Sequence, residues 1–169
     1  MKAGFFALLA PLVLAAPALA EEISIEGARM SRDFACEDGQ DVVISGAENH
    51  VSLTGRCGVV KVLGSKHGLS FEAADALVVS GISIQAEGKA VGNLVVEVTK
   101  NRVRTTVKPS AERAKVDVSG ADQEVELTLA GPTQIEMQGA KNVLRWRAAP
   151  DVKPPSVSAS GIENQISRY

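Results

Sequence analysis

Aromatic side chains are scarce in this chain of 169 residues, of which phenylalanine, tryptophan and tyrosine make up only 4%. Beyond residue 20 they reduce to Phe34, Phe71, Trp146 and Tyr169. An outer-membrane β-barrel carries aromatic girdles at both membrane interfaces. Glycan-binding modules usually display aromatic platforms. The shortage disfavours both classes of protein.

Three further features that the sequence lacks exclude other classes of protein. No stretch after residue 20 is apolar enough for a transmembrane helix. The net charge is only −2 at pH 7 and no basic segment stands out, so neither nucleic acid nor anionic lipid is an expected partner. Long helical periodicity is also missing, which points to an all-β chain.

The first twenty residues have the pattern of a secretory signal. Lys2 precedes an apolar run over residues 5–16, and Ala18-Leu19-Ala20 supplies an A-x-A cleavage site. We therefore predict a cleaved signal peptide over residues 1–20. The mature chain should be exported, either to the periplasm or to the extracellular space.

Cys36 and Cys57 are the only cysteines, and they lie 21 residues apart. A disulfide is the expected state in an oxidising compartment. No C-x-x-C spacing suggests redox chemistry. We predict a structural bridge between cysteines stacked on neighbouring coils, stabilising the fold by about 3 kcal/mol.

A repeated pattern dominates the rest of the chain. Each copy has a β-branched pair before a glycine, then an amide and an aliphatic residue, as in residues 42–51. The spacing is 18 residues from Gly46 to Gly64, 19 from Gly120 to Gly139 and 22 from there to Gly161. The matching amide positions are Asn49, His67, Gln123, Asn142 and Asn164. Self-similarity at this period indicates a solenoid.

Two degenerate copies, residues 77–81 and 96–100, fill the gap of 56 residues between Gly64 and Gly120, with Lys100 read as the glycine position of the second copy. Apolar residues alternate with polar ones within each copy, as in half-buried strands. We predict a single-domain parallel β-solenoid of about seven rungs of 18–22 residues. An antiparallel β-sandwich or barrel is the alternative, because a Ser-Gly-x-x-Asn turn can also close a hairpin.

The expected organisation has five segments. They are a signal peptide over 1–20, an N-terminal cap over 21–41, a β-repeat domain over 42–147, a proline-rich loop over 148–156 and a terminal rung over 157–169. Stacked turns would place the amides one above another, where they can hydrogen-bond along the axis. Trp146 falls at an inward position and is expected to plug the core.

The segment from Cys36 to Cys57 reads Cys-x-x-Gly-x-Asp-Val-x-Ile-x-Gly-x-x-Asn-x-Val-x-Leu-x-Gly-x-Cys. It resembles the bacterial secreted family known as domain of unknown function 3060, whose members have a signal peptide, paired cysteines and repeated Gly-x-x-Asn turns. The resemblance implies an envelope or secreted protein of β-repeat fold. It implies no catalytic residue.

Two metal sites are conceivable. His50 and His67, the only histidines, would lie on adjacent rungs with Glu48 as a third ligand. No metal motif supports this site, and His67 stands where other copies carry an amide. A calcium site would use the acidic cluster near the first turn, but no EF-hand or calcium repeat is present. That cluster consists of Asp33, Glu37, Asp38 and Asp41. We expect no metal and no cofactor.

An enzymatic alternative rests on charged residues in the weakest copies, since functional sites tend to lie where sequence rules break. Arg102, Arg104 and Lys108, with Glu97, would be the acting groups of a polysaccharide-active enzyme on a β-helix scaffold. No Ser-His-Asp arrangement and no phosphate loop support catalysis. A glycan-binding protein on the same scaffold is the related alternative.

The favoured hypothesis is a noncatalytic binding or structural module of the cell envelope. Repeat proteins use their flat, repetitive faces to bind, so the expected partner is an unknown envelope protein or polymer. An unprotected strand edge at the end of the stack would also allow end-to-end self-association.

Overall fold

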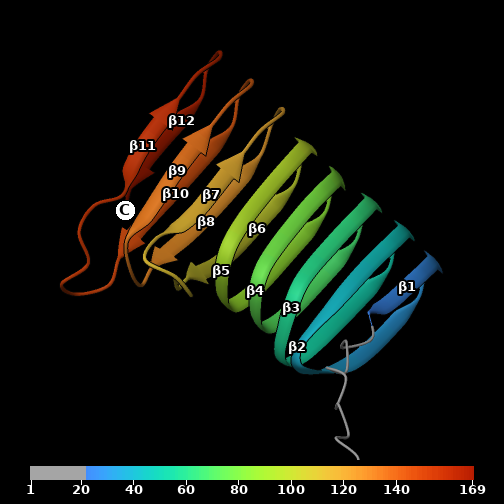
Figure 1. Cartoon of the computed structure of the whole chain (residues 1–169). Helices are drawn as coiled ribbons and strands as arrows, with labels where there is room; N and C mark the ends of the chain where they lie inside the picture. The colour runs from blue at the N-terminus through green and yellow to red at the C-terminus, as the bar shows by residue number, and fades with distance from the viewer. Residues whose placement is uncertain (1–21) are drawn as a thin grey trace, which may run out of the picture.

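The computed structural model describes residues 22–169, in which the chain coils into a stack of β-strands (Figure 1). The predicted signal peptide lies outside the described residues. Among the residues described, no helix is long and apolar enough to cross a membrane. The strands are β1 (Ile23–Ala28), β2 (Ser31–Ala47), β3 (His50–Ser65), β4 (Gly68–Ile82), β5 (Gln85–Thr99), β6 (Arg102–Val107), β7 (Ala114–Val118), β8 (Glu124–Leu129), β9 (Thr133–Met137), β10 (Val143–Ala148), β11 (Ser156–Ala159) and β12 (Gln165–Arg168).

Every strand pairing in the described chain is parallel, and the pairings form two ladders. We call them face A and face B. Face A stacks residues 23–28, 42–47, 60–65, 77–82, 94–99, 114–118, 133–137 and 156–159. Face B stacks residues 31–36, 50–55, 68–73, 85–91, 102–107, 124–129, 143–148 and 165–168. The solenoid prediction is confirmed, and the antiparallel alternative is wrong.

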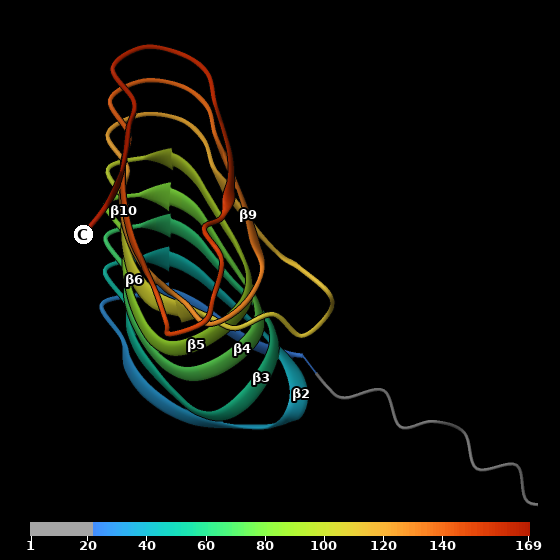
Figure 2. The ribbon, with the colours of Figure 1, turned by 90° about the vertical axis from the view of Figure 1, so that its left-hand side faces the viewer.

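The two faces join at two edges, which Figure 2 shows as the narrow ends of a flattened coil. A short turn carries the chain from face A to face B at one edge. At the other edge, β2–β5 bend continuously, whereas loops over residues 108–113, 130–132 and 149–155 interrupt the later coils. β1 pairs in register with β2, so part of the region expected to form a cap forms a coil. The stack therefore has about eight coils.

The core is narrow and mostly aliphatic. Val42 and Ile44 from face A and Leu53 from face B are almost completely buried, as the alternating pattern predicts. Phe71 is accommodated because Gly88 is its ladder partner, and a Cβ there would lie 2.0 Å from the Phe71 ring. Trp146 points inward with only 9% of its surface exposed.

A ladder of buried polar side chains runs through the turn edge. Asn142 is representative: its oxygen accepts a hydrogen bond from Gln123 N at 3.0 Å on the preceding coil. Its amide nitrogen donates to the carbonyl oxygens of Gly120 at 3.1 Å and Gln138 at 2.9 Å. The same three bonds are made by Asn49, Asn101 and Asn164. Because buried backbone groups need partners, this ladder fixes each coil to the one before it.

His67 is a member of the ladder. Its Nδ1 accepts from Asn49 N at 3.2 Å, and its Nε2 lies 2.9 Å from Leu63 O. The hydrogen therefore resides on Nε2, and the ring takes over two of the bonds that an asparagine makes. Asn101 makes all three bonds of the ladder, although the sequence pattern did not predict it as an amide position.

A column of glycines precedes the amides. Their φ angles lie at +98° to +112° for Gly46, Gly64, Gly120, Gly139 and Gly161. A Cβ at Gly139 would lie 2.0 Å from the carbonyl oxygen of Gly120, so the stacked backbones approach too closely for a side chain. The residue of the column on β5 is Val98 and not Lys100 as predicted, because Val98 pairs with Gly81.

The Cys36–Cys57 disulfide is present, with the two Cα atoms 5.1 Å apart. The vertical stacking that we predicted is wrong, because Cys36 pairs with Gly55 in the ladder and Cys57 pairs with Gln40. The bridge crosses diagonally at the bend, where the register of β2 and β3 shifts. A disulfide is consistent with an oxidising, exported location.

The loss of stability on removing an amide of the ladder should increase with the burial of that amide. Asn142→Ala should lower the free energy of unfolding by about 3 kcal/mol, because it leaves a buried donor and buried acceptors without partners. Asn164→Ala removes equivalent bonds at a half-buried position in the last coil and should cost less, about 1 kcal/mol. Urea titration measures both. Equal costs would contradict burial as the cause.

The strained backbone at Val98 leads us to expect that a glycine at this position would stabilise the fold. Its φ of +78° is strained for a β-branched residue, and its side chain is 47% exposed. Val98→Gly should raise the free energy of unfolding by about 1 kcal/mol, because relief of strain exceeds the added chain entropy. Val95→Gly on the same strand lacks that relief and should lower it by about 1 kcal/mol. Losses in both variants would refute the strain at Val98.

Candidate functional site

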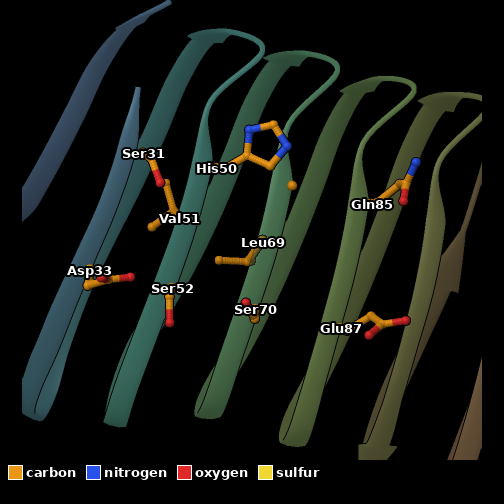
Figure 3. Close-up of a pocket in the computed structure, with 10 residues that line it drawn as sticks. Ser31, Asp33, His50, Val51, Ser52, Leu69, Ser70, Gln85 and Glu87 are labelled. Carbon is orange, nitrogen blue, oxygen red and sulfur yellow. The ribbon is translucent and has the colours of Figure 1, made fainter. Parts of the chain in front are cut away.

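A shallow polar groove of about 280 Å³ crosses the outer surface of face B over β2–β5 (Figure 3). Two outward columns of residues line it. One column stacks Ser31, His50, Gly68 and Gln85, and the other stacks Asp33, Ser52, Ser70 and Glu87. Three of the four middle positions, Ser52, Gly68 and Ser70, are small, so a ligand can approach the sheet closely there.

The polar groups of this groove are largely without partners. The side chains of Ser52, Ser70 and His50 make no hydrogen bond or ion pair with any described residue, and the same holds for Ser31, Asp33 and Gln85. Glu87 reaches one neighbour, Arg104, at 3.8 Å. The groove thus offers hydroxyls, an amide, an imidazole and two carboxylates to an external molecule.

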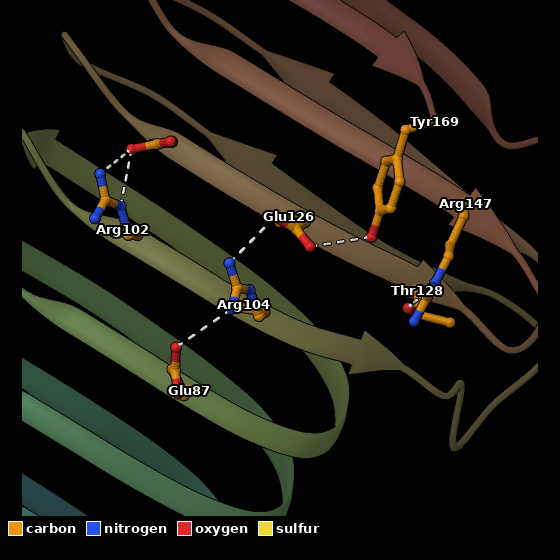
Figure 4. Close-up of polar contacts among 8 residues, drawn as sticks. Glu87, Arg102, Arg104, Glu126, Thr128, Arg147 and Tyr169 are labelled. Carbon is orange, nitrogen blue, oxygen red and sulfur yellow. Dashed lines mark hydrogen bonds and ion pairs between the residues drawn. The ribbon is translucent and has the colours of Figure 1, made fainter.

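On the C-terminal half of face B, two arginines pair with glutamates of the next coil (Figure 4). Arg102 donates to Glu124 at 2.8 Å, and Arg104 donates to Glu126 at 3.4 Å. Tyr169 then donates its hydroxyl hydrogen to Glu126 at 3.2 Å. These charges satisfy one another at an exposed surface, where each pair contributes little stability. Arg145 on the same half is exposed and makes no hydrogen bond or ion pair with any described residue. The two halves of face B therefore differ in how many of their polar groups have partners.

The residues proposed for an enzyme do not converge. Arg102 and Arg104 point out of face B, whereas Glu97 lies in the outward column of face A. Lys108 begins the loop at the bend edge. The arginines are engaged with glutamates on neighbouring coils, so these four residues form no common site.

The residues considered for metal sites are also separated. His67 is buried in the amide ladder, His50 is exposed in the groove, and Glu48 pairs with Arg29 and Lys66 at the turn edge. Asp33 lies in the groove, and Asp41 accepts from Val59 N at 2.6 Å near the bend. Within residues 22–169, no three His, Cys, Asp or Glu side chains come together as a metal site.

Three carboxylates gather on the outer surface of face A. Partial burial raises the pKa of Asp117 above its ordinary value of 3.8, and the neighbouring charges of Glu136 and Glu97 raise this pKa further. Ionised Asp117 is therefore unfavourable in the folded chain. Stability linked to Asp117 is present below pH 3.8 and is lost as the pH rises through the higher pKa of the folded state.

Asp117→Asn should raise the free energy of unfolding at pH 7 relative to the natural chain. The difference should disappear below about pH 3.8, where the carboxyl is protonated in both states. Glu136→Gln should give a smaller gain, because it removes the repulsion and leaves the burial of Asp117. Urea titrations from pH 3 to pH 8 test this prediction, which fails if the gain from Asp117→Asn does not depend on pH.

The groove has the chemistry of a binding surface. Its carboxylates accept hydrogen bonds, so a ligand must present hydroxyl or amine donors near Asp33 and Glu87. Those two residues lie three coil spacings apart, about 14 Å at 4.8 Å per coil. Two serines bridge this distance at regular intervals. An extended polar chain running along the axis fits these positions.

Sequence reasoning missed the groove. Its residues are ordinary polar residues that are far apart in the chain, and they meet only after the coils stack in register. The signal was accessible: Ser31, His50, Gly68 and Gln85 each follow the glycine slot by four residues. Alignment of the outward positions of successive copies would have placed the eight groove residues in two columns.

Residues 44–101 match a protein family described as "Protein of unknown function (DUF3060)". This confirms the resemblance seen in the motif between Cys36 and Cys57. The match spans about a third of the chain, from face A of β2 to the turn after β5, and includes most of the groove. Neither the curated proteins nor the solved structures that were searched contain a match. The protein is thus a parallel β-solenoid in which residues 44–101 are similar to this family.

Proposed function

We propose that this protein is an exported, noncatalytic binding module of the cell envelope, and that face B of β2–β5 holds a polar envelope polymer. The location would be the periplasm or the extracellular space, in keeping with the predicted signal peptide and with the disulfide. The observation that carries the proposal is the row of polar side chains without partners in the groove. On the neighbouring half of the same face, Arg102 and Arg104 instead pair with glutamates.

The groove favours a particular kind of polymer. Its charged members, Asp33 and Glu87, are acidic, and its middle positions are two serines, a glycine and His50. Such a surface suits a chain rich in hydroxyl and N–H donors. No aromatic residue lines it, so hydrogen bonds would supply specificity. We therefore propose a glycan strand bearing amino sugars, held along the axis without aromatic stacking.

Cosedimentation with purified peptidoglycan sacculi tests this proposal. The processed protein should bind saturably. Ser70→Trp, which fills the floor of the groove, should weaken binding by about tenfold or more. Asp33→Asn combined with Glu87→Gln should weaken it less, because hydroxyl contacts remain. Ser158→Trp, at an exposed outward position of face A, is the matched control and should bind normally.

Two results would contradict the proposal. One is the absence of saturable binding at concentrations up to about 100 μM, well above the dissociation constant of a modest interaction. The other is equal loss of binding in Ser70→Trp and Ser158→Trp, which would place the contact elsewhere. Circular dichroism and urea titration would establish that each variant is folded.

A further inference from the structure

The turn edge carries a column of charged residues whose signs alternate along the stack. Each member has a φ between +55° and +59°, and each is the residue before the amide slot. Glu48 bridges its two neighbours, with Arg29 at 3.0 Å and Lys66 at 3.5 Å. From the first coil to the last, the column is Arg29, Glu48, Lys66, Ser83, Lys100, Asp122, Lys141 and Glu163. Only Ser83, standing in the place of an acid, interrupts the alternation.

The two ends of this column are complementary. It begins with a cation, Arg29, and finishes with an anion, Glu163. Arg29 already pairs with Glu48 on its inner side, and its outer side faces the N-terminal end of the stack. A second copy placed in continuation would set Glu163 of one chain beside Arg29 of the next, which extends the alternation without a break.

The strand edges at both ends are unpaired within the described chain. β1 pairs only with β2, and β12 pairs only with β10. The last coil keeps the features of an interior coil, with Gly161 at φ +104° and Asn164 in the amide slot. Terminal repeats usually depart from the repeat to form a polar cap. An interior-type coil with a free edge is a template for another strand.

Apolar side chains accompany these edges on face A. Val157 on β11 is 48% exposed although it occupies an inward position of the ladder. At the opposite end, Ile23 and Ile25 occupy the inward positions of β1. In a continued stack, Val157 would cover Ile23, and the core of one copy would join that of the next.

We infer that the processed protein assembles head to tail with further copies of itself, the last coil of one pairing in parallel with the first coil of the next. The ladder register places Glu163 beside Arg29, Gln165 beside Ser31 and Ser167 beside Asp33 of the next copy. None of these directly opposed pairs has like charges. Such a heterologous contact does not close on itself and generates a filament.

Met30 and Arg32 are the two least regular positions of the junction. Met30 would stand over Asn164, a combination that resembles Ile84 over His67 inside the stack, where the backbone bond from Gln85 N to His67 O is still made at 2.8 Å. Arg32 occupies an inward position and would oppose Ile166. The aliphatic part of the Arg32 side chain can cover apolar surface while its guanidinium reaches water. Its charge at this position still lowers the affinity of one copy for the next. Assembly should therefore be reversible and dependent on concentration.

Sedimentation analysis of the processed protein, from about 1 μM to about 1 mM, tests this inference. The natural chain should form a series of oligomers whose average size increases with protein concentration and decreases in high salt. Arg29→Glu and Glu163→Lys should each weaken association by about tenfold. Lys100→Glu, an equivalent charge reversal inside the column, should leave association unchanged. Arg32→Leu should strengthen it.

A mixing experiment gives the sharpest result. Arg29→Glu and Glu163→Lys, each weakly associating alone, should assemble together to the natural extent, because every junction in an alternating filament then pairs opposite charges. A natural chain that stays monomeric throughout the concentration range would overturn the inference. So would a mixture that associates no better than its components. Both readouts are independent of any ligand in the groove.

Discussion

Hydrogen bonds between successive coils determine everything else in this fold, because each coil is held in place by the coil before it. Backbone ladders on two faces provide most of these bonds, and each asparagine of the amide column adds two side-chain bonds to the preceding coil and one within its own turn. A slip of one residue would turn the aliphatic core outward and would also break the amide contacts. The two sets of bonds therefore select the same register.

This vertical register is what creates the groove and the charged column. Each is assembled from residues about one coil apart in sequence, and neither exists within a single coil. Two arginine–glutamate pairs lie on the C-terminal half of face B, and polar groups that mostly lack partners lie on the N-terminal half. One repeated backbone thus supports two different surfaces, because outward positions are free to vary while inward positions must pack.

The fold could be predicted because inward residues and turn residues repeat. Gly46, Asn49 and Ile44 carry a periodic signal that survives in most copies. The prediction failed at Val98, where strain is tolerated in a slot that otherwise holds glycine, and where Lys100 was read in its place. The groove could not be read in the same way, since His50 and Ser52 match no repeated pattern and acquire meaning only from neighbouring coils.

The turn edge has a fixed length and the bend edge does not, and this difference determines where the chain can accept insertions. In every coil, the first residue of face B follows the glycine slot by four positions. Differences in coil length fall at the bend edge, as in the loop over residues 149–155. Extra peptide inserted there would be displayed beside the stack without shifting its alignment. That edge is where evolution can lengthen the molecule, and where an engineer can graft an epitope.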